Sequence, residues 1–118
     1  MDYILFICTD PAAPEYVQAD DNIEEWVAEM DARGVHERGD RLRPPTDAKS
    51  VVVRDGQVRV TDGPFAETKE WIAGYDLITC ENLDEAIEIA AKHPMARFGK
   101  IEVRPAWPMG LGGERSAG

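Results

Sequence analysis

The sequence predicts an α+β fold in which one antiparallel sheet carries two helices on the same face. The main observation is a repeat at an offset of 60 residues, in which an apolar strand precedes Asn-x-x-Glu and then apolar residues at helical spacing. A second observation is the hairpin signal Asp55-Gly56 between the two copies, and a third is a final strand of alternating polar and apolar residues. Two βαβ-like units that share one sheet form a ferredoxin-like βαββαβ core, here with a hairpin insertion.

The first copy of the repeat predicts a strand over residues 3–8 and then a helix. Asn22 is the expected N-cap of this helix, and Glu25 is its capping-box partner. Gly34 is expected to end the helix, because glycine adopts the left-handed conformation that closes a helix. The apolar face of the helix comprises Ile23, Trp26, Val27 and Met30.

The second copy predicts a strand over residues 75–80 and a helix that begins after Asn82. Glu85 occupies the capping-box position, and the pair His93-Pro94 is expected to end the helix. The apolar face of this helix comprises Leu83, Ala86, Ile87 and Ala90.

Further segments before and after the second copy show strand patterns. Residues 50–54 and 57–61 are expected to pair as a hairpin, and residues 100–104 predict a half-buried strand that ends at Pro105. We therefore expect one domain over residues 1–108 and a flexible, Gly-rich C-terminal tail over residues 109–118.

Composition limits the class of partner. The chain has 118 residues, of which 43% are hydrophobic, which suits a single core. With 13 basic and 23 acidic residues the net charge is −10, which disfavours nucleic acid and anionic membrane surfaces as partners. Residues 1–8 are apolar but have neither a basic leader nor a small-residue cleavage site, so they predict a buried strand. We expect a cytoplasmic protein.

The cysteines and histidines do not form a metal-binding pattern. Cys8 and Cys80 are expected to be small buried hydrophobic residues in a reducing compartment. The alternative is that the two thiols lie near one another, since the first and third strands are neighbours in this fold. His36 and His93 are distant in sequence from each other and from both cysteines, and no phosphate loop or dinucleotide fingerprint is present. We therefore expect neither a metal nor a cofactor.

The segment Asp62-Gly63-Pro64-Phe65-Ala66-Glu67-Thr68-Lys69-Glu70 combines a rigid turn with four charges. Gly63 permits a backbone conformation closed to other residues, and Pro64 fixes φ. If the chain runs extended beyond Pro64, Phe65, Glu67 and Lys69 share one face. An acid and a base would then lie side by side, as a polar site requires.

This segment, followed by Gly74-Tyr75, resembles the signature of the DGPF subgroup of the YCII-related family. Residues 43–45, 53–56, 83–86 and 102–105 are similar to further segments of such proteins. The resemblance implies a small homodimer with a ferredoxin-like core, assembled as a dimeric α+β barrel. It also implies a link to regulation by extracytoplasmic-function sigma factors. Some members pair a histidine on the first helix with an aspartate as a proposed acid–base dyad, but residues 22–33 contain no histidine, so that dyad is not carried over.

The candidate site residues centre on the motif. Candidates for catalysis are Asp62, Glu67, Lys69 and His93, and candidates for ligand binding are Gly63, Pro64, Phe65, Thr68, Tyr75 and Arg104. Each has a structural alternative. Asp62 can simply cap its turn, Glu67 and Lys69 can form a solvated pair, and the two aromatic residues can belong to the core or an interface.

The histidines and arginines carry alternatives of the same kind. His93 can interact with the dipole at the end of the second helix, whereas His36, in the polar connection over residues 35–40, is expected at the surface. Arg41, Arg43 and Arg104 can anchor an anionic substrate or neutralise neighbouring acids.

Two functions remain open from the sequence. The first is a dimer that binds a small organic ligand or a regulatory partner through a cleft beside the motif loop. The alternative is a cofactor-free acid–base enzyme, a lyase or isomerase acting on a small anionic or aromatic metabolite. An enzyme requires the titratable residues to meet in one pocket, whereas a binding module requires only a cleft.

Overall fold

The structure is a computed structural model that describes residues 1–63 and 71–108 of the 118. The strands are β1 (Asp2–Cys8), β2 (His36–Arg41), β3 (Lys49–Arg54), β4 (Gln57–Asp62), β5 (Ile72–Thr79) and β6 (Lys100–Pro105). The helices are α1 (Ile23–Ala32), α2 (Leu83–Lys92) and the short α3 (Met95–Phe98), with single 3-10 turns at η1 (Gln18–Asp20) and η2 (Pro45–Asp47). The motif residues 64–70 and the tail 109–118 lie outside the described ranges.

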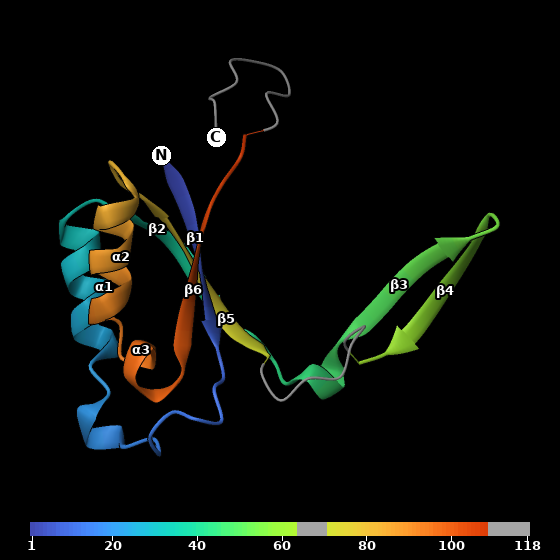
Figure 1. The fold of residues 1–118 in the computed structure, drawn as a ribbon, viewed down its shortest axis with the longest axis horizontal. Helices are drawn as coiled ribbons and strands as arrows, with labels where there is room; N and C mark the ends of the chain where they lie inside the picture. The colour runs from blue at the N-terminus through green and yellow to red at the C-terminus, as the bar shows by residue number, and fades with distance from the viewer. Residues whose placement is uncertain (64–70, 109–118) are drawn as a thin grey trace.

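The predicted ferredoxin-like core is confirmed. Four strands form an antiparallel sheet in the order β2-β5-β1-β6, with the two crossover connections supplied by α1 and α2. Both helices lie on the same face of this sheet, and α3 lies at their lower end (Figure 1). β3 and β4 form a separate two-stranded hairpin, inserted between β2 and β5.

The core lies between the sheet and the helices because β1 and β5 alternate strictly. Tyr3, Leu5 and Ile7 of β1 are buried toward the helices, while the residues between them are only partly buried on the opposite face. The helices contribute Trp26 and Met30, both almost completely buried. Burying one large apolar side chain stabilises the fold by about 1.5–3 kcal/mol, so this layer is the main source of stability.

Helix α1 begins differently from the prediction. Asn22 is its N-cap, but the Asn22 side chain makes no capping hydrogen bond. The carboxylate of Asp21 instead accepts the backbone N–H of Ile23 at 3.1 Å. Gly34 has φ 71° after the helix, as expected for a residue that ends it.

Helix α2 has the predicted cap but a different buried face. Asn82 Oδ1 accepts the backbone N–H of Glu85 at 2.9 Å. The buried residues are Ala86, Ile89 and Ala90, whereas Leu83 and Ile87 are about half exposed. Ala86 and Ala90 of the predicted face are therefore confirmed as buried, whereas the prediction was wrong for Leu83 and Ile87 and missed Ile89.

The polar segment after α1 is a strand, which corrects the expected surface connection. β2 pairs with β5, and its sequence His-Glu-Arg-Gly-Asp-Arg shows no apolar alternation because it is an edge strand with few core contacts. The prediction that His36 lies at the surface was wrong as well. Only 12% of its side chain is exposed.

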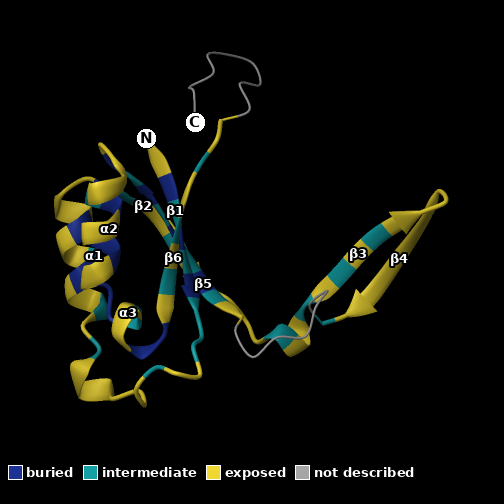
Figure 2. Cartoon of the chain, viewed as in Figure 1, coloured by how far each residue is buried: buried dark blue, intermediate teal, exposed yellow. Residues whose placement is uncertain are grey.

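The hairpin of β3 and β4, which we call the arm, stands away from the rest of the molecule (Figure 1). Asp55 and Gly56 form its two-residue turn, with φ 53° and 74°, as the sequence predicted. Most of its side chains are exposed (Figure 2).

The two cysteines lie apart. β1 and β5 are neighbours, but they run antiparallel, so Cys8 lies at the end of β1 that pairs with Ile72 and Cys80 follows the opposite end of β5. The alternative of adjacent thiols was therefore wrong, and Cys80 is a buried core residue. None of the described helices has the length and apolar character needed to cross a membrane.

Candidate functional site

A carboxylate is buried between the sheet and the helices. Asp76 of β5 points to the same side as Gly74 and Ile78 and is only 9% exposed. Its two oxygens face two histidines: Oδ1 lies 2.9 Å from Nε2 of His36, and Oδ2 lies 3.5 Å from Nε2 of His93. We call these three residues the His–Asp–His cluster. A buried carboxylate is costly unless partners of this kind hold it.

Gly39 makes room for the carboxylate. It pairs with Asp76 across β2 and β5, so a side chain at either position points to the same face. A Cβ on residue 39 would lie 2.0 Å from Asp76 Oδ1 and 2.7 Å from the backbone oxygen of Tyr75. The absence of a side chain at this position is therefore part of how the cluster is built.

His36 is held at both ring nitrogens. Nε2 faces Asp76, and Nδ1 lies 3.0 Å from Oδ1 of Asp31, a more exposed residue near the end of α1. The doubly protonated ring donates to both carboxylates, whereas the neutral ring can donate to only one of them. Asp31 thus connects the inner part of the cluster to solvent.

The geometry around His93 determines its tautomer. The backbone N–H of Met95 donates to Nδ1 of His93 at 3.0 Å, so Nδ1 carries no proton. Nε2 consequently holds the proton and points it toward Asp76. His93 follows α2 directly and is only 5% exposed, which corresponds to the helix-end position expected from the sequence.

Trp26 packs over both histidines. Its ring centroid lies 5.4 Å from that of His36 and 4.7 Å from that of His93, both in edge-on geometry. The indole N–H donates to the backbone oxygen of Ile89 at 2.9 Å, which fixes the ring against α2. The Trp26 ring therefore links both histidines of the cluster to the apolar core, to which it belongs.

A pocket of about 670 Å³ lies beside this arrangement. It is bounded by η1 and the start of α1 on one side and by the end of α2 and α3 on the other, and Trp26 and His93 belong to its wall. Its charged lining residues are the acids Asp20, Asp21, Glu25 and Glu29 and the bases Lys92 and Arg97. Within the described residues, no group of three histidine, cysteine or acidic side chains is arranged to hold a metal ion.

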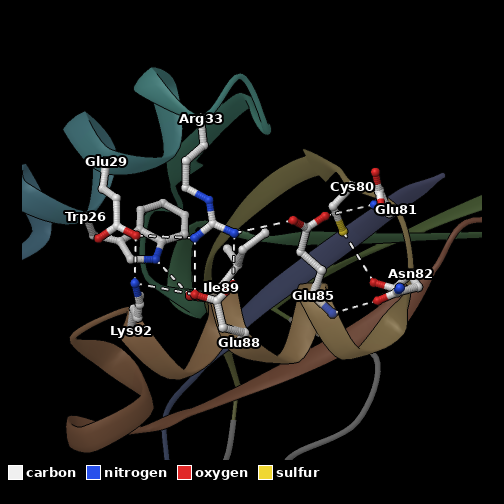
Figure 3. A network of polar contacts seen from close by, with 10 residues as sticks. All are labelled: Trp26, Glu29, Arg33, Cys80, Glu81, Asn82, Glu85, Glu88, Ile89 and Lys92. Carbon is white, nitrogen blue, oxygen red and sulfur yellow. Dashed lines mark hydrogen bonds and ion pairs between the residues drawn. The ribbon is translucent and has the colours of Figure 1, made fainter.

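An ion-pair network on the outer surface fixes α1 against α2 (Figure 3). Arg33 of α1 binds Glu88 of α2 at 2.8 Å, and Lys92 of α2 binds Glu29 of α1 at 2.8 Å. Hydrogen bonds from Arg33 and Lys92 lower the pKa of Glu88, and those from Lys92 and Arg33 lower the pKa of Glu29. The same contacts raise the pKa of Lys92. Because Glu29 and Lys92 also line the pocket, the network joins the α1 side of the pocket to its α2 side.

The structure distributes the predicted site residues over different regions. His93 belongs to the His–Asp–His cluster, whereas Asp62 and Gly63 lie at the base of the arm, where the exposed Asp62 forms an ion pair with Lys49. Tyr75 lies on the opposite face of the sheet, where its hydroxyl donates to Asp40 and accepts from Arg38, each at 2.8 Å.

Two arginines weighed as anchors bind neighbouring acids instead, Arg43 with Asp47 and Arg104 with Glu102. The predicted residues Pro64, Phe65, Glu67, Thr68 and Lys69 lie outside the described residues. The structure therefore does not bring Asp62, Tyr75 and His93 together.

Sequence reasoning missed His36 and Asp76. The signal for Asp76 was available, since it is the one charged residue in the otherwise apolar run of β5, at a position that alternation places toward the core. His36 could be found only after β2 had been recognised. The two histidines that hold Asp76 of β5 thus come from β2 and from the residue after α2, not from the first helix.

Comparison with known proteins agrees with these observations. Residues 1–110 match the YCII-related domain. An uncharacterised protein of Rhizobium meliloti (strain 1021) is 46% identical over 67 residues, which cover 55% of this chain and 54% of that protein. The chain thus spans about half the length of the relative it matches. Since the domain match covers nearly the whole chain and agrees with the observed fold, the protein belongs to the YCII-related family.

Proposed function

We propose that this protein binds a small organic ligand in the pocket between η1–α1 and α2–α3. The observation that carries the proposal is the pocket itself: about 670 Å³, with a wall that includes an aspartate-bound histidine. Ligand sites for small molecules typically have volumes of about 300–1,000 Å³ and combine aromatic walls with a few placed polar groups. Trp26 and His93 provide such a wall.

The sequence placed the ligand beside the motif loop instead. Asp62 and Gly63, the described residues that open the motif, lie at the base of the arm. The pocket lies on the helix side of the sheet, so the proposal moves the ligand to that side. A regulatory partner of the kind that the resemblance implies, linked to a sigma factor, and a cytoplasmic location remain predictions.

A second candidate is cofactor-free acid–base catalysis, and the His–Asp–His cluster favours it. A carboxylate held between two imidazoles places three groups that can carry a proton next to one another, as acid–base catalysis in a lyase or isomerase requires. His93 is the member of the cluster that reaches the pocket wall. In this candidate His93 exchanges one of its two ring contacts, the Met95 N–H or Asp76, for the substrate, while His36 with Asp31 connects Asp76 to solvent.

We also propose that the protein is a homodimer that covers the free face of its sheet. No described helix packs on the face formed by Ile4 and Phe6 of β1 and by Tyr75 and Leu77 of β5, which we call the uncovered face. The four side chains of this face are only partly buried within a single copy of the chain. A second copy that packs sheet to sheet would complete their burial.

A thermal-shift screen tests ligand binding. Wild-type protein is screened against small amines, phenols and carboxylates, because a ligand at about 100 times its Kd stabilises the folded state by about 2.7 kcal/mol. The pocket is filled by Ala91→Phe, at an exposed position of α2 that lines it. The matched control is Ala28→Phe, at an exposed position of α1 outside the pocket. A hit should be lost in Ala91→Phe and kept in Ala28→Phe.

The same screen separates the two candidates. A ligand that binds both the wild type and Asp76→Asn, and that neither protein converts to a product, supports binding alone. Turnover of the ligand that disappears in Asp76→Asn while its binding persists supports the enzyme. A hit that Ala91→Phe retains would contradict the pocket assignment.

A further inference from the structure

The arm carries four valines on one face. Strand pairing sets Val51 opposite Val60 and Val53 opposite Val58, and paired residues share a face. Their exposed fractions are 56–67%. The other face is more polar, with Val52 opposite Arg59 between Ser50 and Arg54. We call Val51, Val53, Val58 and Val60 the valine face.

Within the part of the chain that the structure describes, the arm lacks the packing that a hairpin needs. Among the described helices and strands, β3 and β4 contact each other, and no other element makes more than marginal contact with them. A two-stranded hairpin alone is at best marginally stable in water, and an exposed apolar face on it promotes association. The valine face therefore requires a surface to cover it.

The position of the arm indicates where that surface lies. The arm leaves the molecule between β2 and β5 and projects on the side of the sheet opposite to α1 and α2 (Figure 1). The uncovered face of the sheet lies on the same side. A body that covered this face would consequently lie next to the arm as well.

Charge favours a second copy of this chain as that body. Over residues 49–62, Lys49, Arg54 and Arg59 outnumber Asp55 and Asp62, so the arm has a net charge of +1. The whole chain has −10, which leaves −11 on the remainder. In a two-fold symmetric dimer, the arm of each copy, with its net positive charge, would lie against the acidic body of the other copy. The favourable contact would therefore occur twice in each dimer.

We propose that the valine face of each arm docks on the body of a second copy, so that the two arms clasp the dimer. The inference rests on the homodimer proposed above and adds a second contact to it.

The test compares two neighbouring positions on opposite faces of β3. Val51→Asp places a charge in the valine face, whereas Val52→Asp places the same charge beside Arg59 on the other face. The dimer dissociation constant is measured by sedimentation equilibrium on the full chain. We expect Val51→Asp to raise it at least about tenfold, which corresponds to about 1.4 kcal/mol, and Val52→Asp to change it less than about twofold.

Two further measurements separate the arm from the sheet. Phe6→Thr on the uncovered face should weaken the sheet-to-sheet contact of the dimer, whether or not the arm docks on the second copy. Hydrogen exchange of the β3–β4 amides in the wild type should slow at concentrations that favour the dimer, which tests the clasp without any substitution. If Val51→Asp dimerises like the wild type, or arm exchange does not depend on concentration, the clasp is wrong and the sheet dimer stands. A wild type that stays monomeric overturns both.

Discussion

Gly39 and Asp76 face each other across β2 and β5, and the Asp76 carboxylate occupies the space that a Cβ on residue 39 would fill. This relationship predicts that Gly39→Ala is destabilising, because the new Cβ would lie 2.0 Å from Oδ1 and must displace it. Overpacking of a close-packed site typically costs about 1–3 kcal/mol. Urea unfolding measures the loss.

A double-mutant cycle identifies the cause of that loss. Combined with Asp76→Ala, the Gly39→Ala substitution should cost less than it does alone, because part of the collision is with the carboxylate. The collision with the backbone oxygen of Tyr75, at 2.7 Å, remains in both backgrounds. Equal costs in the two backgrounds would show that the carboxylate does not determine the need for glycine.

The two carboxylates that contact His36 should differ in their importance for stability. Asp76→Asn replaces a buried acceptor of two histidines with a group that presents N–H donors, and we expect a loss of about 1–3 kcal/mol. Asp31→Asn changes a side chain that is 57% exposed, and we expect less than about 1 kcal/mol. Denaturant unfolding of both variants at neutral pH gives the comparison. Equal losses would contradict the central place of Asp76.

The ion-pair network between α1 and α2 predicts loss of stability in acid. The folded pKa values of Glu29 and Glu88 lie below the ordinary value of 4.5, so both carboxylates stabilise the fold above that pH. This contribution is lost as the pH falls from about 4.5 through the lowered folded pKa values. Unfolding free energies measured between about pH 7 and about pH 3 should therefore decrease less in Glu29→Gln/Glu88→Gln than in the wild type. Parallel curves would exclude the network as a source of acid sensitivity.

The two helix caps offer a matched pair of substitutions. Asn82→Ala removes the acceptor of the Glu85 N–H and should cost about 1 kcal/mol. Asn22 holds the equivalent position in the first repeat copy, but its side chain makes no capping hydrogen bond. Asn22→Ala should therefore lower the unfolding free energy by at most about a few tenths of 1 kcal/mol. Asp21→Ala, which removes the acceptor of the Ile23 N–H, should reproduce the larger effect. Thermal unfolding of the three variants checks this order.

The sequence was sufficient for the core topology because the strands and helices of both repeat copies carry their own periodicity. The two Asn-x-x-Glu motifs look alike in sequence, yet only Asn82 caps with its side chain. The difference depends on the approach of the preceding chain: Asp21 reaches Ile23 first in α1. Local pattern cannot distinguish such competing acceptors.

The candidate site was less predictable because its members carry no common local signal. His36 and Asp76 are 40 residues apart, and they meet only because an edge strand of polar sequence pairs with a central strand. Gly39 has no local turn to explain it, and its role follows from the register of that pairing. The conspicuous motif begins at the base of the arm, whereas the histidines lie on the helix-covered side of the sheet. The strongest local signal in the sequence therefore indicated a different region of the molecule.

The His–Asp–His cluster draws on both halves of the repeat, since His36 comes from the first half and Asp76 and His93 come from the second. Neither half alone supplies both histidines that hold the Asp76 carboxylate, so we expect a chain in which only one half has folded to leave this carboxylate more exposed to water. Assembly of the two halves is thereby coupled to formation of the cluster. A circular permutant that keeps both halves intact would preserve this coupling, whereas a fragment that ends between them would lose the cluster together with the cooperativity of folding.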